Sequence, residues 1–336
     1  MKPKDRDFVE TREGMFFCVA GYLHPADRVT AYLKYVPTAE GKWGRGGTRY
    51  TRTLDYYHVS QVENTYRYLS ENHLRYLYDC PVRNIQLSAV PYTDIETYYH
   101  PTERLGSIMT NPRDPLEEKA AAVARLLGEH VDPGCLGVTG SLLLGSHNPA
   151  FSDIDLTVYG RDNAELVREA VLEAKRSGEF RFYTEDEALD WCSKRAQIFP
   201  LSVEELRRVL DRRWNFGYVQ GTYMSIHPTR SDPEITEAYG DYTYRKQGEV
   251  HGTATVTDTR ESIYLPAVIH VEDSQLEDLD VDVSMIVSYE GLYCDLFEPG
   301  ENVEFRGSLE KVSGKKGFTR VVLGGAGSTG GYVKWV

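Results

Sequence analysis

The stretch LGVTGSLLLGSHNPAFSDIDLTVYG, residues 136–160, carries the pattern that decides the fold. A short apolar run ends at Gly140 and Ser141, eleven residues follow, and Asp153 and Asp155 then open a second apolar run as an Asp-x-Asp pair. Side chains alternate along a strand, so both carboxylates are expected to point to the same face. Two carboxylates on one face, close to a Gly-Ser turn, suit a hard divalent cation that also contacts phosphates. We therefore predict a site for a metal ion and a nucleoside triphosphate.

The segments around this stretch predict an α+β core over residues 113–247. Asp114 is expected to cap a helix, with Pro115 at its first position and Glu117 completing a capping box. Two later boxes, Thr-x-x-Glu from 184 and Ser-x-x-Glu from 202, predict two further helix starts. The predicted elements are a helix at 115–130, a strand at 135–139, a helical turn at 142–144, a strand at 153–158, a helix at 163–176, helices ending near 196 and 213, and a strand at 218–227.

Residues 1–112 predict an α/β accessory domain. Two apolar, aromatic-rich runs around a His-Pro-Ala-Asp-Arg turn predict a hairpin at 14–37. A helical pattern at 59–78 and a strand-like run at 85–90 follow. Several prolines then punctuate the chain, and we place the domain junction at 111–114.

The segment GKWGRGGTRYTR at 41–52 interleaves basic with aromatic side chains in an otherwise acidic protein. It is suited to grip phosphates or to stack a base, and a solvated hairpin tip is the alternative interpretation. The basic residues are Lys42, Arg45, Arg49 and Arg52, and the aromatic ones are Trp43 and Tyr50.

Residues 248–336 predict a third domain, a small β-barrel for which we weigh an OB-like form. Six short alternating or β-branched runs, separated by Gly, Pro and Asp, indicate six strands. The loop at 311–320 carries Lys315, Lys316, Phe318 and Arg320. It is a candidate contact for RNA or DNA, and a solvated hairpin tip is the equal alternative.

The composition of the chain limits which classes of protein we expect. The chain has 336 residues, a net charge of −13 and five scattered cysteines. The charge argues against broad, non-specific binding of a polyanion, although a local basic groove is compatible with it. The cysteines form no C-x-x-C pair, which fits a reduced cytoplasm and gives no reason to expect structural zinc. The N-terminus has no apolar core and no run approaches eighteen apolar residues, so we expect a soluble protein without a membrane partner.

The pattern from Gly140-Ser141 to Asp153-x-Asp155 resembles the minimal signature of the DNA polymerase β-like nucleotidyltransferase superfamily. Members carry Gly-Ser at the end of one strand, ten to twelve residues, and Asp-x-Asp on the next strand, and here the second half reads Ser-Asp-Ile-Asp-Leu. The amino-acid sequence of the stretch also looks like that of uncharacterised archaeal nucleotidyltransferase-domain proteins of about this length. The superfamily motif itself covers only about twenty-five residues, whereas the archaeal likeness extends over most of the chain.

The resemblance implies a polymerase β-like core and a specific reaction. Asp153 and Asp155 would hold Mg²⁺, with room for a second ion and with Mn²⁺ as a substitute, and Gly140 and Ser141 would bind the nucleotide's phosphates. An acceptor hydroxyl on a nucleic acid, small molecule or protein would attack the α-phosphate of an NTP. A nucleoside monophosphate would be transferred and pyrophosphate released.

One departure from the superfamily pattern opens an alternative. Members usually supply a third carboxylate from a later strand, but the strand at 218–227 offers Gln220, Ser225 and His227 and no acid. Either another residue such as His227 takes part, or the fold binds nucleotide or nucleic acid without turnover. An incidental Asp pair on a structural scaffold is the third and weakest interpretation.

Overall fold

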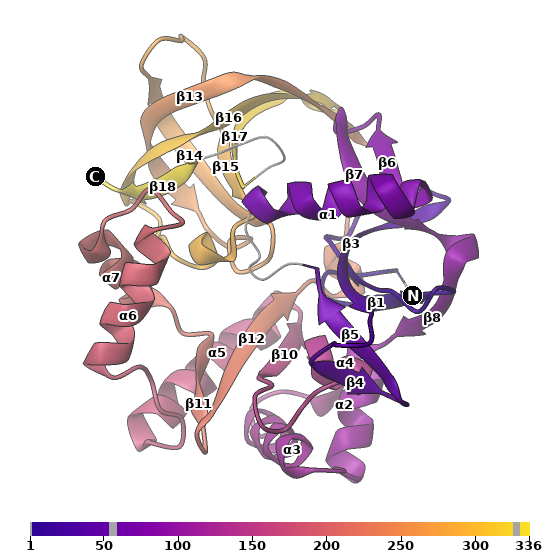
Figure 1. Ribbon diagram of the computed structural model, residues 1–336. Helices are drawn as coiled ribbons and strands as arrows, with labels where there is room; N and C mark the ends of the chain where they lie inside the picture. The colour runs from indigo at the N-terminus through magenta and orange to yellow at the C-terminus, as the bar shows by residue number, and fades with distance from the viewer. Residues whose placement is uncertain (1, 54–58, 325–329) are drawn as a thin grey trace.

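The computed structural model describes residues 2–53, 59–324 and 330–336, which form a mixed α+β protein (Figure 1). Three sheets organise this described part: an N-terminal sheet, a central sheet that carries residues 136–160, and a C-terminal ring-like sheet. Figure 1 shows the C-terminal sheet above, the N-terminal sheet to the right and the central sheet below. The α+β class predicted from the sequence is confirmed. No helix in the described ranges is both long and apolar enough to cross a membrane.

The central sheet contains the strands β9 (Leu136–Val138), β10 (Ile154–Tyr159), β11 (Phe216–Val219) and β12 (Thr222–Thr229). Their order is β11-β12-β10-β9, with β10 parallel to β12 and the other pairs antiparallel. The predicted strands at 135–139 and 153–158 are confirmed. The single strand predicted at 218–227 is wrong, because Gln220 and Gly221 both have positive φ and turn the chain into a β11–β12 hairpin.

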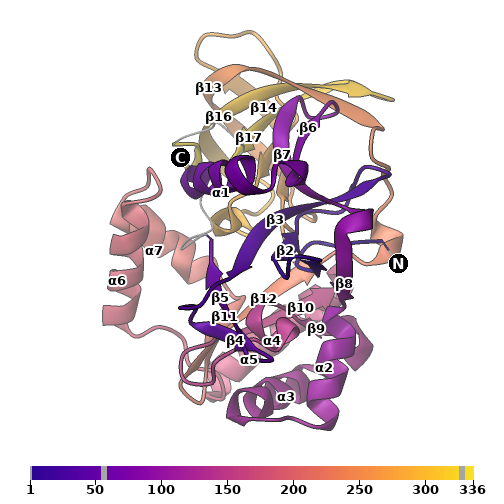
Figure 2. The ribbon, with the colours of Figure 1, turned by 45° about the vertical axis from the view of Figure 1, so that its right-hand side comes forward.

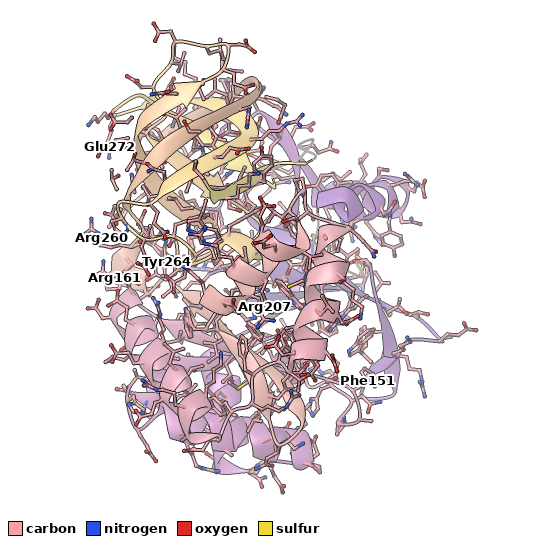
Figure 3. All side chains as sticks on the ribbon, turned by 90° about the vertical axis from the view of Figure 1, so that its left-hand side faces the viewer. Phe151, Arg161, Arg207, Arg260, Tyr264 and Glu272 are labelled. Atoms are coloured by element: carbon pink, nitrogen blue, oxygen red, sulfur yellow. The ribbon has the colours of Figure 1, made fainter. Side chains whose placement is uncertain are left out.

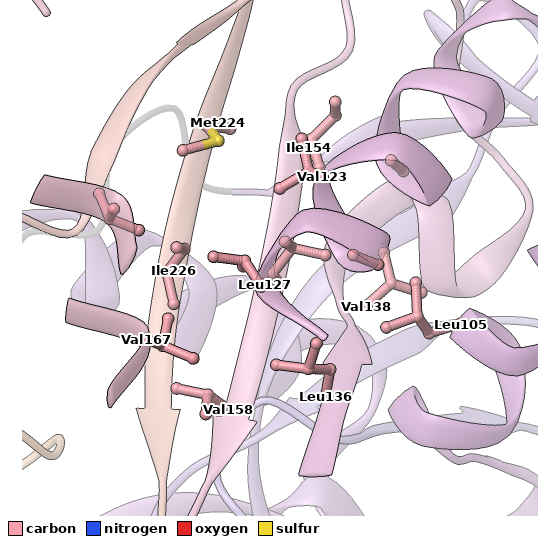
Figure 4. Close-up of a cluster of buried hydrophobic side chains, with 14 of the residues drawn as sticks. Leu105, Val123, Leu127, Leu136, Val138, Ile154, Val158, Val167, Met224 and Ile226 are labelled. Atoms are coloured by element: carbon pink, nitrogen blue, oxygen red, sulfur yellow. The ribbon is translucent and has the colours of Figure 1, made fainter. Parts of the chain in front are cut away.

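Helices cover one face of the central sheet. Figure 4 shows Val123 and Leu127 from a helix packing on Ile154 and Val158 of β10. Burial of these apolar side chains fixes which face of each strand is left for polar residues. The helices with side chains in this core are α2 (Pro101–Thr110), α3 (Pro115–Leu127), α4 (Gly140–Leu144) and α5 (Arg161–Ser177). The helices α6 (Glu185–Ala196) and α7 (Val203–Arg212) bury their apolar side chains in a cluster with the C-terminal strands.

The helix starts test the capping predictions. The boxes beginning at Thr184 and Ser202 are both present, at the starts of α6 and α7. Asp114 caps α3 as predicted, accepting from the backbone N–H groups of the second and third helical residues. Glu117 does not complete that box, because its carboxylate accepts instead from the backbone N–H of Arg113. Helix α2 was not predicted, because the sequence prediction treated the prolines of this region as breaks. Pro101 stands at the first helical position, where proline is tolerated.

The N-terminal sheet confirms the hairpin predicted at 14–37, formed by β2 and β3. The helix predicted at 59–78 ends earlier, at Asn72, and a strand begins at Leu77. The described elements are β1 (Phe8–Thr11), β2 (Phe16–Val19), β3 (Arg28–Pro37), β4 (Trp43–Arg45), β5 (Thr48–Arg52), α1 (Val59–Asn72), β6 (Leu77–Cys80), β7 (Ile85–Pro91) and β8 (Ile95–Tyr99).

The N-terminal sheet shares a core with the Gly-Ser turn. Leu143 and Leu144 of α4 are buried in one cluster with Phe8, Phe16 and other aromatic side chains of the N-terminal strands. Figure 2 shows the strands β4 and β5 of this sheet beside α4. The residues after the turn are therefore held from both sides, by the central sheet and by the N-terminal sheet.

We expect Leu144→Ala to weaken this junction. Leu144 is 2% exposed, and truncating such a side chain costs about 2–5 kcal/mol of unfolding free energy. Denaturant unfolding measures the loss, with Leu189→Ala as the matched control. Leu189 is 58% exposed, so its truncation is expected to change stability by less than about 0.5 kcal/mol. Equal losses in the two variants would contradict a shared core.

All six C-terminal strands predicted from the sequence are present. They are β13 (Tyr242–Asp258), β14 (Ala267–Leu276), β15 (Met285–Ser288), β16 (Asn302–Gly314), β17 (Phe318–Leu323) and β18 (Tyr332–Trp335). Five of them pair in the order β13-β14-β15-β17-β16, and β16 pairs back to β13, which closes a ring. Strand β13 begins at Tyr242, a few residues before the predicted domain start at 248.

Candidate functional site

Asp153 and Asp155 lie at the start of β10, opposite the helix-covered face. Ile154 and Leu156 are fully buried in the helix-side core, so the odd-numbered neighbours point the other way. Asp153 precedes the strand and is exposed at its rim, whereas the Asp155 side chain is 31% exposed. The Asp-x-Asp pair thus presents both carboxylates on the side that faces the N-terminal sheet.

The structure brings the Gly-Ser turn to Asp155, as the sequence predicts. The backbone N–H of Thr139 donates to the carbonyl of Asp155 at 2.8 Å, which joins the two halves of the motif. Gly140 has φ +65°, and a Cβ placed there would lie 2.8 Å from Oδ2 of Asp155. Any other residue would therefore strain the backbone here, and its Cβ would push the Asp155 carboxylate aside. Ser141, the second predicted phosphate contact, is 6% exposed.

Gly140→Ala and Gly145→Ala separate backbone strain from the contact with Asp155. Both glycines have nearly the same positive φ, but the space around Gly145 is open. A positive φ alone is expected to cost each variant about 1–2 kcal/mol of unfolding free energy. We expect Gly140→Ala to lose more than Gly145→Ala, because its methyl group displaces the Asp155 carboxylate. Thermal unfolding of both variants measures the difference, and identical losses would contradict the close approach.

Ser225 and His227 occupy the strand next to Asp155. In the parallel pairing of β10 with β12, Asp155 is opposite Ser225. The Ser225 hydroxyl donates to Oδ1 of Asp155 at 2.6 Å and lies 2.9 Å from Nε2 of His227. That same Nε2 is 3.7 Å from Oδ1 of Asp155. The residues of β12 that face Asp155 are thus a serine and a histidine, and β12 carries no acid.

The electrostatics of the pair are asymmetric. Desolvation and the charge of Asp155 raise the pKa of Asp153, against the lowering effect of Arg52. Desolvation also acts on Asp155, but the neighbouring His227, the charge of Lys34 and the hydrogen bond from Ser225 outweigh it and hold its pKa well below the usual range. Desolvation and the charge of Arg6 lower the pKa of His227 to about 4, so its imidazole is neutral at pH 7.

Basic side chains of the N-terminal sheet face the two carboxylates. Lys34 on β3 is 7% exposed and acts on Asp155, and Arg52 at the end of β5 acts on Asp153. Arg52 also stacks on the ring of Trp43, with its guanidinium carbon 4.5 Å from the ring centroid. The carboxylates thus lie in a locally basic setting within an acidic protein.

The basic segment at 41–52 packs on the loop between Gly-Ser and Asp-x-Asp. The N–H of Gly44 donates to the carbonyl of Ser146 at 3.2 Å, and Trp43 meets Phe151 edge to face. Figure 3 shows Phe151 beside this N-terminal ribbon. Of its arginines, Arg45 pairs with Glu10 and Arg49 donates to the carbonyl of Gly41, whereas the charge of Arg52 acts on Asp153.

The basic loop of the C-terminal sheet is only partly exposed. Arg320 is 8% exposed and forms an ion pair with Glu310 at 2.7 Å, so it acts as a structural residue. Lys315 and Lys316 remain exposed at the turn. Of the four residues predicted as a candidate contact, only the two lysines are thus fully exposed, because spacing alone does not show which side chain turns inward.

A buried ionic network, absent from our sequence predictions, anchors the motif loop. Arg104 of α2 donates to the carbonyl of Leu142 at 3.1 Å and to the carboxylate of Glu117. His147, within the loop, lies 2.7 Å from the capping carboxylate of Asp114. The sequence contains one signal for this network, His147 between the Gly-Ser pair and the Asp-x-Asp pair, but its partner Asp114 lies outside the motif.

This network also contains a group with metal-like spacing. Asp114, Glu117 and His147 place one ligand atom each within 4.8 Å of one another, and this is the one such group among the described residues. Arg104 already neutralises Glu117 there, so we interpret the group as an ion-pair network. Asp153 and Asp155 form no such three-ligand group in the described ranges.

The fold and this site define an α+β protein with a paired carboxylate site set against basic residues. No family model matches the sequence, and no solved structure matches it. The chain is 33% identical to the uncharacterized protein MJ1086 of Methanocaldococcus jannaschii over 331 residues, which cover 96% of each protein. The chain belongs to the family of that protein.

Proposed function

We propose that the central sheet is a polymerase β-like core and that the protein transfers a nucleoside monophosphate from an NTP to an acceptor hydroxyl. The observation that carries the proposal is the contact between the Gly140 turn and Asp155, with Asp153 on the same face. A glycine that leaves room for the Asp155 carboxylate joins the two halves of the motif in one site. A solvated Asp-x-Asp turn would need neither the glycine nor the spacing.

The donor set fits a divalent cation such as Mg²⁺. Desolvation and, after it, the charge of Asp155 raise the pKa of Asp153, and a bound cation would relieve the repulsion between the two carboxylates. Asp153 and Asp155 would hold the ion, and the bound ion would neutralise phosphate charge and polarise the acceptor hydroxyl. Mn²⁺ is expected to serve as well.

The residues of this chain would do the positioning. Lys34 and Arg52 supply positive charge beside the carboxylates, which favours the triphosphate of an NTP. Gly140 lets the backbone approach the site closely. Phosphoryl chemistry of this kind depends chiefly on positioning and on charge stabilisation, so such a site needs no covalent residue.

The acceptor class is open between nucleic acid, protein and small molecule. The ring order of the C-terminal strands, with β15 and β17 parallel, supports an OB-like barrel, a form that often binds oligonucleotides. The cavity beside β13, however, is lined by Glu249, Glu277 and Asp278 as well as Arg306, an acidic setting for a polyanion. An RNA or DNA acceptor is therefore one arm of the test.

Transfer of the α-phosphate is the test of the proposal. The protein is incubated with Mg²⁺ or Mn²⁺, with NTPs labelled at the α- or the γ-phosphate, and with pooled RNA, DNA, protein or small-molecule acceptors. We expect α-label in an acceptor, no γ-label in it, and release of pyrophosphate. Transfer of γ-label, or release of phosphate in place of pyrophosphate, would contradict the proposal.

A second candidate function is nucleotide binding without turnover. The observation that favours it is the lack of an acid on β12, where Ser225 and His227 face Asp155. Saturable binding of NTP with a divalent cation, but no pyrophosphate with any acceptor pool, is the result that selects it.

A further inference from the structure

The side chains of β12 place an imidazole beside Asp155, the carboxylate proposed above to bind a metal ion. Tyr223, Ser225 and His227 share one face of the strand, because side chains alternate. Of these, His227 directs Nε2 toward Asp155, at 3.7 Å from Oδ1. The Ser225 hydroxyl lies between the two and contacts both. Asp155, Ser225 and His227 therefore form one polar cluster on the face that carries the Asp-x-Asp pair.

The spacing suits two ligands of one ion. Metal–ligand bonds of about 2.0–2.2 Å put neighbouring ligand atoms about 3.0–3.5 Å apart in tetrahedral or octahedral geometry. The observed 3.7 Å between Nε2 of His227 and Oδ1 of Asp155 is close to that range. A small shift of the imidazole, with exchange of its contact to Ser225, would bring both atoms onto one ion.

We propose that His227 is a metal ligand together with Asp155, and that the site therefore prefers Mn²⁺ or a similar first-row ion over Mg²⁺. The inference rests on the proposed function, since it concerns the same carboxylates. Mg²⁺ favours oxygen ligands, whereas the first-row divalent metals accept imidazole nitrogen more readily, least of all Mn²⁺ and increasingly along the series. A site in which an imidazole joins the Asp155 carboxylate departs from an all-oxygen site in that direction.

Spectroscopy of the Mn²⁺-loaded protein tests this inference without requiring turnover. Electron spin-echo modulation detects nitrogen bound directly to Mn²⁺. We expect a ¹⁴N signal in the wild-type protein, its loss in His227→Asp, and loss of the bound Mn²⁺ itself in Asp155→Asn. His270→Asp, the same change on barrel strand β14, is the control and should retain the signal.

Metal affinity gives the second readout. His227→Asp restores an all-oxygen site, so the ratio of Mg²⁺ to Mn²⁺ affinity is expected to rise about 10-fold or more. Mn²⁺ that depends on Asp155 but gives no nitrogen signal would overturn the inference and make His227 a positioning residue. Mn²⁺ binding that is unaffected by Asp155→Asn would overturn it as well. The proposed function fails separately, by the absence of α-label transfer with either metal.

Discussion

Asp155→Asn is expected to reduce pyrophosphate release at least about 100-fold, the scale seen when a central charge-stabilising or metal-binding group is removed. Asparagine keeps the shape of the side chain, and its amide can still meet the hydroxyl of Ser225. The variant loses the negative charge that a cation requires. The fold should survive, since the Asp155 side chain is 31% exposed and contributes no apolar packing.

The matched control for this variant is Asp162→Asn. Asp162 lies at the start of α5 with a side chain that is 88% exposed, so the same chemical change occurs away from the site. Its activity should equal that of the wild type, and thermal unfolding of both variants checks that they are folded. Comparable activity in Asp155→Asn and wild type would remove Asp155 from the reaction.

Arg104→Met is expected to have the largest effect on stability. Glu117 is 1% exposed and pairs with Arg104, so loss of the guanidinium leaves a buried carboxylate without its charged partner. Removing one member of such a pair costs about 3–5 kcal/mol of unfolding free energy. The carbonyl of Leu142, next to the Gly-Ser turn, loses its donor at the same time.

A double variant shows whether the buried charge is the cause. Arg104→Met combined with Glu117→Gln removes both charges, and we expect it to be more stable than Arg104→Met alone. Urea unfolding of the single and double variants measures the coupling. A double variant that is as unstable as the sum of its parts would show that packing, and not the ion pair, explains the loss.

The site motif was predictable because its information is local. Gly140 and Asp155 lie within one short stretch, and strand alternation alone orients the Asp-x-Asp pair. The hairpin that carries Ser225 was predicted as one strand, because Gln220-Gly221 is a weaker turn signal than Asn-Gly. The structure shows that turn by its two positive φ angles.

The basic side of the site could not be predicted, because tertiary packing creates it. Lys34 sits in an apolar run, VTAYLKYV, where nothing local indicates its neighbours. Its charge acts on Asp155 because Leu143 and Leu144 of α4 pack against the N-terminal sheet. Glu117 shows the same limit. Its spacing from Asp114 indicates a capping box, but its carboxylate accepts instead from the backbone N–H of Arg113 and from the side chain of Arg104.

Calorimetric titration with a non-hydrolysable NTP analogue tests the central claim most directly, because binding needs no acceptor. The claim is that Asp153 and Asp155 form one site for a divalent cation and a triphosphate. We predict saturable binding of one analogue per chain that requires Mg²⁺ or Mn²⁺ and is lost in the Asp153→Asn/Asp155→Asn variant. Binding that persists in this variant or without the cation, or no binding by the wild-type protein, would contradict the claim.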